Sequence, residues 1–462
     1  MNAPAARFES AHAVPAVEAR PASDVSAITG VIGLAALFAW ILVCRSWPAL
    51  VDTFGLGGPR EVMSGPNAAL MGVVFSAGAM SAWAVLVEKV HRRSSTGIDW
   101  DNPRPLSAVV DVSLVKLVGL WTTFAIIGAF YCMGRWYWSG NYLFALEVIG
   151  WAALPIAVLA IPYVLWLDRR LIEPRDAAWH FGSMVLGRGS WDIKQVMKHG
   201  RAWFIKAFFT AFMVSIVPLG FRTIVEADIG AVLNNPVALG VLLFELLFVI
   251  DVQIGTVGYL MTFRPLDAHI RSGNPLLAGW VAALMCYPPI VWGIMGNDRP
   301  LGYEYSTGGW AWWFEGHEAL LWVWMAWLVA LTFAYAWATF AFGLRFSNLT
   351  YRGVITNGPY RFTRHPAYVS KNLFWWCTTL PFLVTNGSFT DAVRNTFFLG
   401  CVSAIYFWRA KTEEAHLLAE DEKYVAYHAW MARHGLITAP LERVKRVLVR
   451  RARGGGAPRP AE

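Results

Sequence analysis

Apolar stretches, each about as long as a bilayer is thick, constrain this 462-residue chain more than any other feature. A helix rises about 1.5 Å per residue, so roughly 20 apolar residues cross the hydrocarbon core. Only 15% of the residues are charged, whereas a soluble domain carries about a quarter. The sequence therefore predicts an all-α, polytopic helical membrane protein. The expected crossings, about ten in number, are residues 27–44, 67–88, 108–133, 143–166, 203–221, 236–262, 276–295, 319–342, 370–385 and 392–408.

Positive charge alternates between the two sets of connecting loops. The loops that follow the even-numbered stretches hold most of the Lys and Arg residues, and the other loops hold about one cation each. Because cytoplasmic loops are enriched in Lys and Arg, we expect both termini in the cytoplasm. We expect the protein in a bacterial-type inner (plasma) membrane. This topology also explains the net charge of +8. No base-stacking or groove-reading motif accompanies the charge, so we expect no nucleic-acid partner.

Composition divides the chain into four parts. Residues 1–26 are polar and rich in Ala and Pro, and we expect a disordered cytoplasmic N-terminus. Residues 27–310 are expected to form an N-terminal membrane region of about seven helices, followed by a C-terminal core over residues 311–441. Residues 442–462 form a basic tail, which suits contact with anionic membrane lipids.

Several polar residues interrupt the apolar stretches. They are Asp111, Lys116, Glu147, Glu245, Asp251 and Gln253. A charge at membrane depth is costly and usually faces a cavity or a partner, which makes Glu245 a functional candidate. Asp111, Lys116 and Asp251 can instead reach the membrane interface with their side chains. The five cysteines lack the spacing of metal ligands, and we expect no metal site.

A dense polar motif, "NGPYRFTRHPAYVSK", occupies residues 357–371 between two apolar stretches. Its Gly-Pro step breaks the chain, and Pro366 suits the first position of a new helix. Arg364 and His365 would then lie at a helix N-terminus, where exposed backbone N–H groups favour an anion. The arginines alone could be topology signals, but that reading does not explain the His-Pro-x-Tyr spacing.

A second polar stretch, "WRAKTEEAHLLAEDEKYVAYHAW", follows the last apolar stretch. Arg409 and Glu413 are four residues apart, so they share one face of a helix. Taken alone, the pattern is equally typical of a solvated helix beside the membrane.

Together the two stretches resemble the C-terminal core of the isoprenylcysteine carboxyl methyltransferase family, whose relatives include bacterial membrane methyltransferases and, more distantly, phospholipid N-methyltransferases. The resemblance rests on "GPYR", "RHPAY", a Glu-Glu pair and "KYVAY", and it covers about residues 320–440. It implies a membrane methyltransferase that uses S-adenosylmethionine at a site facing the cytoplasm. The acceptor would be a lipophilic small molecule or lipid, such as an isoprenoid-linked carboxylate; the oligomeric state stays open.

The same resemblance implies which residues bind the cofactor. They are Gly358, Pro359, Tyr360, Arg364, His365, Pro366, Tyr368 and Glu414, with Glu413 beside them. The chemistry of methyl transfer suggests two further roles: Arg409 would hold an acceptor carboxylate, and Glu413 or Glu414 would take a proton from a protonated acceptor.

The sequence departs from the family at one point. The family usually has a glycine where this chain has Ser370, and Lys371 adds a charge where family members are often apolar. Two other functions remain open. Sterol reductases that use NADPH resemble the same core, although they usually have tryptophans in place of "GPY". A non-catalytic transport protein could also reuse it.

Overall fold

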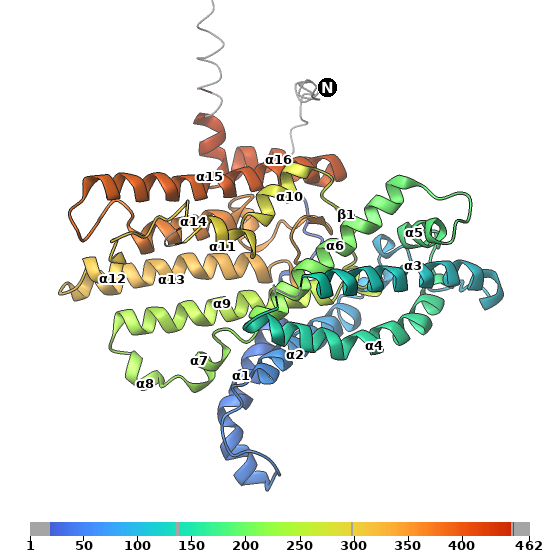
Figure 1. Ribbon diagram of the computed structural model, residues 1–462, viewed down its shortest axis with the longest axis horizontal. Coiled ribbons are helices and arrows are strands. Elements are labelled where there is room, and N and C mark those ends of the chain that lie inside the picture. Colours follow the sequence, from blue (N-terminus) through green and yellow to red (C-terminus); the bar gives the residue numbers. More distant parts are fainter. Residues whose placement is uncertain (1–18, 135–137, 297–298, 445–446, 448–462) are drawn as a thin grey trace, which may run out of the picture.

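The computed structural model describes residues 19–134, 138–296, 299–444 and 447, and it is mostly helical (Figure 1). Within these residues, seven segments are long and apolar enough to cross a membrane. They are α1 (Ala27–Phe54), α2 (Pro66–Leu86), α3 (Leu106–Met133), α4 (Asn141–Asp168), α6 with α7 (Ile193–Glu226), α9 (Pro236–Leu260) and α13 (Glu318–Phe340). The prediction of a polytopic helical membrane protein is confirmed.

The other three expected crossings are not long apolar helices, so the expected ten are corrected to seven candidates among the described residues. Residues 276–295 form two short helices, α10 (Leu277–Leu284) and α11 (Ile290–Ile294). Two prolines lie between them, and proline lacks the N–H that a continuous helix needs. The ninth stretch is α14 (Pro366–Thr379), of only 14 residues. The tenth is the apolar half of α15 (Phe389–Glu420), a helix of 32 residues that continues into the polar stretch.

Short elements complete the fold. The helices are α5 (Ala177–Val185), α7 (Phe221–Glu226), α8 (Ile229–Val232), α12 (Gly309–Trp313) and α16 (Glu422–His434), and 3-10 turns include η1 (Val90–Arg92), η2 (Ser94–Thr96), η4 (Arg264–Leu266), η5 (Gly343–Arg345) and η6 (Gly358–Arg361). One antiparallel pair, β1 (Ser272–Gly273) with β2 (Thr350–Tyr351), ties the loop after α9 to the loop after α13.

Helices α9, α13, α14 and α15 lie one beside the next, so a helix of the N-terminal region joins the C-terminal core in one stack (Figure 1). Leu37 of α1, Met80 of α2, Ile254 of α9 and Phe340 of α13 belong to a single buried apolar cluster. In the described part of the chain, the C-terminal core and the helices before it therefore share one buried apolar interior, and no boundary separates them as independently folding domains.

A network of charges joins the cation-rich loops at one end of the helices. Arg345 Nη2 lies 2.5 Å from Asp267 Oδ2, and Arg93 Nη1 lies 3.8 Å from the same oxygen. Arg93 also donates to the backbone carbonyl of Asp24, whose carboxylate lies 2.5 Å from Lys423 Nζ. The loops after α2, α9 and α13 therefore share one end of the molecule with the N-terminal segment, as the charge pattern predicts.

Part of the N-terminus that we expected to be disordered is packed against this network. Asp24 accepts a hydrogen bond from the N–H of Val354 at 2.7 Å, and Asn357 donates to the carbonyl of Val25 at 2.7 Å. The expectation is therefore wrong for residues 19–26. Residues 1–18 lie outside the described residues, as does most of the basic tail.

Candidate functional site

A cavity of about 350 Å³ lies between the loop after α13 and helices α9, α13, α14 and α15. Cavities of this size commonly hold small molecules and cofactors. Its lining changes along its length. The loop after α13, the start of α14 and the polar half of α15 contribute Arg352, Arg364, His365 and Glu413, and we call this part the polar end. Helices α6, α9, α13 and α14 contribute Ile216, Phe248, Asp251, Val252, Tyr335 and Lys371, and we call this part the membrane end.

The Arg-His-Pro motif forms part of the polar end. Pro366 begins α14, as the sequence predicts, and His365 occupies the position just before the helix. Arg364 Nη1 lies 3.2 Å from Glu414 Oε1, and His365 Nε2 lies 3.0 Å from the same oxygen. The two polar stretches of the sequence, 49 residues apart at this contact, therefore meet at one site.

The backbone of the Gly-Pro step needs its glycine. Gly358 has a φ of +55°, and a Cβ at this position would lie 3.0 Å from Trp337 Nε1. A left-handed conformation and a close approach to α13 both favour glycine. This glycine sets the path of η6, which carries Tyr360 into the cavity lining.

Glu414 is surrounded by cationic groups. Lys411 Nζ lies 2.6 Å from its Oε2, and His428 Nε2 lies 3.7 Å from that oxygen. Burial raises the pKa of Glu414, but hydrogen bonds from His365 and His428 and the charge of Arg364 outweigh it. The pKa of this carboxyl is therefore well below its usual range, so Glu414 is ionised at neutral pH.

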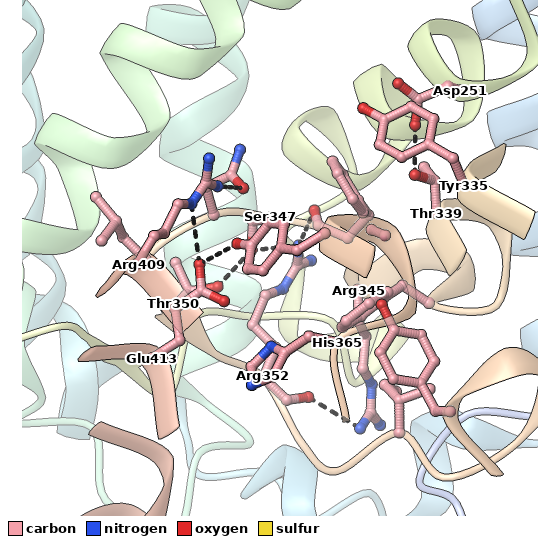
Figure 2. Close-up of a pocket in the computed structure, with 18 of the residues that line it drawn as sticks. Asp251, Tyr335, Thr339, Arg345, Ser347, Thr350, Arg352, His365, Arg409 and Glu413 are labelled. Atoms are coloured by element: carbon pink, nitrogen blue, oxygen red, sulfur yellow. Dashed lines mark hydrogen bonds and ion pairs between the residues drawn. The ribbon is translucent and has the colours of Figure 1, made fainter. Parts of the chain in front are cut away.

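Glu413 faces the cavity beside Glu414. Tyr368 donates a hydrogen bond to Glu413 Oε1 at 2.5 Å, and Arg409 Nε lies 3.2 Å from the same oxygen. The shared helical face expected for Arg409 and Glu413 is therefore present (Figure 2). Arg409 Nη2 also donates to Asn348 Oδ1 at 2.5 Å.

Aromatic rings flank the Arg409 guanidinium. Its Cζ lies 5.4 Å from the ring centre of Tyr287 and 5.1 Å from that of Tyr368. Both rings line the cavity, and cation–π contacts of this kind fix an arginine where few water molecules reach it. Arg409 thus projects into the cavity with its plane held by two rings and two acceptors.

The structure brings most of the expected site residues to one cavity. Tyr360, Arg364, His365, Tyr368, Arg409 and Glu413 line it. The lining does not include Gly358, Pro359, Pro366 or Glu414. The first three shape the backbone of the motif, and Glu414 contacts two lining residues from behind.

The membrane end contains charges that the sequence reading did not select. Asp251 of α9 lines the cavity beside Tyr335 and Thr339, and the Thr339 hydroxyl donates to its carboxylate (Figure 2). Lys371 of α14 lines the same end. Glu245, our intramembrane candidate, is not among the lining residues.

Two of the other intramembrane groups are paired elsewhere. Lys116 Nζ lies 2.6 Å from Asp168 Oδ1, and both side chains are buried. Asp111 pairs with Arg188 at 2.9 Å on an exposed surface. These contacts give both residues a structural role away from the cavity.

Sequence reasoning missed the partners that lie far away along the chain. Asn348 contacts Arg409 from 61 positions away in the sequence, and Tyr287 lies still further from it along the chain. No local pattern reveals either contact. His428 lies in the second polar stretch, one residue after "KYVAY", and contacts both Arg364 and Glu414. The sequence feature that could have identified His428 as a site residue is its position one helical turn after Tyr424.

A comparison with known families identifies part of the chain. Residues 320–419 match the isoprenylcysteine carboxyl methyltransferase (ICMT) family. Members of that family are membrane methyltransferases with S-adenosylmethionine as the methyl donor. No curated protein and no solved structure matches the chain. The family match favours methyl transfer over the reductase and transport alternatives.

Proposed function

We propose that this chain, whose residues 320–419 form an isoprenylcysteine carboxyl methyltransferase domain, methylates a lipophilic acceptor at the inner face of the membrane. The acceptor would be an isoprenoid-linked carboxylate or a lipid. The observation that carries the proposal is one cavity with a charged end among the loops and an apolar end between helices. A polar cofactor and a lipophilic acceptor need these two surroundings within reach of each other.

The residues of the polar end fit S-adenosylmethionine. The cofactor carries a carboxylate, an ammonium, ribose hydroxyls and a sulfonium. Arg364 and His365 suit the carboxylate, and Glu413 suits the ammonium or the hydroxyls. The faces of Tyr360 and Tyr368 suit the sulfonium. When bound, the cofactor would supply an electrophilic methyl group.

Glu414 would act as a positioning residue in this arrangement. Its carboxylate holds Arg364 and His365 at 3.2 and 3.0 Å and is 5% exposed. Without it, Arg364 would lose a buried ion-pair partner and His365 a hydrogen-bond partner. Of the two neighbouring glutamates, Glu413 is the one whose side chain reaches the cavity.

Arg409 would hold the acceptor. Methyl transfer is an in-line displacement, so fixing the two reactants supplies most of the acceleration. The Arg409 guanidinium is held by Asn348 and Glu413 and would bind a carboxylate of the acceptor. A carboxylate needs no base, whereas a protonated amine must first lose a proton, for which Glu413 is the nearest carboxylate.

The charge of the loops supports a cytoplasmic opening. The polar end shares its layer with Arg345 and Arg352, in the loop after α13. Loops enriched in arginine face the cytoplasm in inner membranes, where a soluble cofactor would enter. The acceptor would enter sideways from the bilayer.

Binding of radiolabelled S-adenosylmethionine to the purified full chain tests this function. We expect saturable binding that is weakened at least about tenfold by His365→Ala, which removes a hydrogen-bonding group. Arg188→Ala, at an exposed pair far from the cavity, is the control and should bind as the parent does. A chain that folds but does not bind the cofactor would rule the function out.

A further inference from the structure

We propose that Asp251 and Lys371 form a subsite for a hydroxyl group of the lipophilic acceptor, at the membrane end of the cavity. This inference rests on the proposed function and names the chemical class of its acceptor. It also gives the helices before residue 320 a part in the site, because Asp251 belongs to α9.

Lys371 reaches the cavity from α14 inside a group of aromatic rings. Its Nζ lies 5.1 Å from the ring centre of Trp375, 5.4 Å from Tyr335 and 5.7 Å from Tyr406. Among the described residues, no carboxylate oxygen lies within the 4.0 Å of an ion pair with this ammonium. An ammonium has three N–H donors, and rings satisfy them less well than an oxygen does.

Asp251 faces the same space from the opposite helix. Thr339 donates to its carboxylate, and the Tyr335 ring lies directly beside it (Figure 2). A carboxylate has about four acceptor positions, so these neighbours leave acceptor capacity free. Tyr335 contacts both charged groups, which places Asp251 and Lys371 in one part of the cavity without a direct ion pair.

A carboxyl group and an amine that face one space in a membrane favour a ligand that suits both. An isolated charge at this depth is costly, and a ligand that pairs with only one of them leaves the other unsatisfied. A carboxylate would be repelled by Asp251, and an ammonium would be repelled by Lys371. A hydroxyl accepts from Lys371 and donates to Asp251, so it satisfies both with one atom.

The surrounding side chains require the rest of this ligand to be apolar. Ile216, Phe248, Val252 and Tyr406 line the same end of the cavity. Apolar surface of this kind favours a hydrocarbon body at about 25 cal/mol per Å² buried. The acceptor is therefore a lipophilic alcohol or phenol in its membrane-end portion.

A matched series of probes tests the subsite on the unmodified protein. The full chain in lipid nanodiscs is given a radiolabelled fifteen-carbon isoprenoid alcohol, which is displaced by the unlabelled alcohol or by its methyl ether. We expect the alcohol to bind at least about tenfold more tightly than the ether, because the ether cannot donate to a charged acceptor. Equal binding of alcohol and ether would overturn the proposal.

Two variants with matched controls assign the effect to these residues. Asp251→Asn should reduce the preference for alcohol over ether by about tenfold, because that preference comes from donation to Asp251. Lys371→Met removes a donor from which both oxygens accept, so it should weaken the binding of alcohol and ether alike, by about tenfold. Lys206→Met and Glu245→Gln remove a lysine of α6 and an acid of α9 that do not line the cavity, so the preference should persist. An unchanged preference in Asp251→Asn, or unchanged affinities of both ligands for Lys371→Met, would contradict the assignment.

Cofactor binding in the same preparations separates this inference from the proposed function. If S-adenosylmethionine binds but the alcohol has no advantage, the hydroxyl subsite is wrong and the methyltransferase remains. If the cofactor does not bind to folded protein, the proposed function fails, whatever the alcohol does.

Discussion

The two ends of the cavity use charge in opposite ways. At the polar end, Glu414 touches Arg364, His365 and Lys411 within 3.2 Å, so its charge is fully compensated. At the membrane end, Asp251 and Lys371 face the same space without an ion pair. A saturated charge cluster holds its members in place, whereas separated charges remain available to a ligand. This difference divides the site into a rigid frame and a binding surface.

Breaking the saturated cluster should have the largest effect. Glu414→Ala removes the buried carboxylate that Arg364 and His365 share and leaves Arg364 its ion pair with Glu442 at 2.9 Å. Removing one partner of a buried pair costs about 3–5 kcal/mol. We expect thermal unfolding at a much lower temperature and cofactor binding weakened by at least about 100-fold.

Glu414→Gln is the matched control for that variant. The amide keeps hydrogen-bond acceptance and volume, so it should lose less stability than the alanine variant. Equal unfolding temperatures for the two variants would mean that the cluster is not held by charge.

Arg409 connects the two ends. Its replacement should weaken the use of the acceptor while leaving the binding of the cofactor nearly unchanged. Lysine has no planar guanidinium, so it cannot keep the hydrogen bonds to Asn348 and Glu413 in the same geometry. We expect Arg409→Lys to reduce methylation at low acceptor concentration by about 10- to 100-fold, which corresponds to a charged hydrogen bond.

The binding of S-adenosylmethionine to Arg409→Lys should stay within a few-fold of the parent, as equilibrium binding of labelled cofactor would measure. A loss of cofactor affinity as large as the loss of methylation would place Arg409 at the cofactor instead.

The backbone of the polar end offers a smaller test. Gly358→Ala introduces a left-handed non-glycine residue and a contact at 3.0 Å with Trp337, for which we expect a stability loss of about 1–3 kcal/mol. Gly387 also has a positive φ of +69°, but nothing lies within 4 Å of a Cβ there. Chemical unfolding of Gly387→Ala should therefore show the smaller loss, and the reverse order would contradict the packing around η6.

Acid should weaken the polar end gradually. The folded-state pKa of Glu414 is lowered, so its contribution is complete well above the unfolded value of about 4.3 and is lost as the pH falls through and below it. We expect the difference in unfolding temperature between the parent and Glu414→Gln to change little from pH 7 to pH 5 and to shrink as the pH falls further, from about pH 4 to about pH 3. A difference that grows on acidification would contradict the lowered pKa.

The sequence predicts the class of fold and the two polar stretches well because both depend on local signals. Apolar length identifies seven segments as candidate spans among the described residues, and the positions of Pro366 and of the Arg409–Glu413 pair follow from helix geometry. It fails at residues 276–295, where prolines inside an apolar run divide the helix.

The membrane end of the cavity could not be predicted in the same way. Asp251 and Thr339 meet across 88 positions of the chain, and Lys371 joins them from a third helix. A periodic pattern places a charge on a helix face but does not say which helix packs there. Asp251 therefore looked no different from Asp111, which pairs with Arg188 on the surface.

A structure of the purified chain with bound S-adenosylhomocysteine, the demethylated cofactor, would show directly whether the cavity is the cofactor site. We expect a nucleoside in the polar end, in contact with His365 and Glu413, with its sulfur directed towards Arg409 and the membrane end. A nucleoside bound elsewhere on the chain, with this cavity empty, would contradict it.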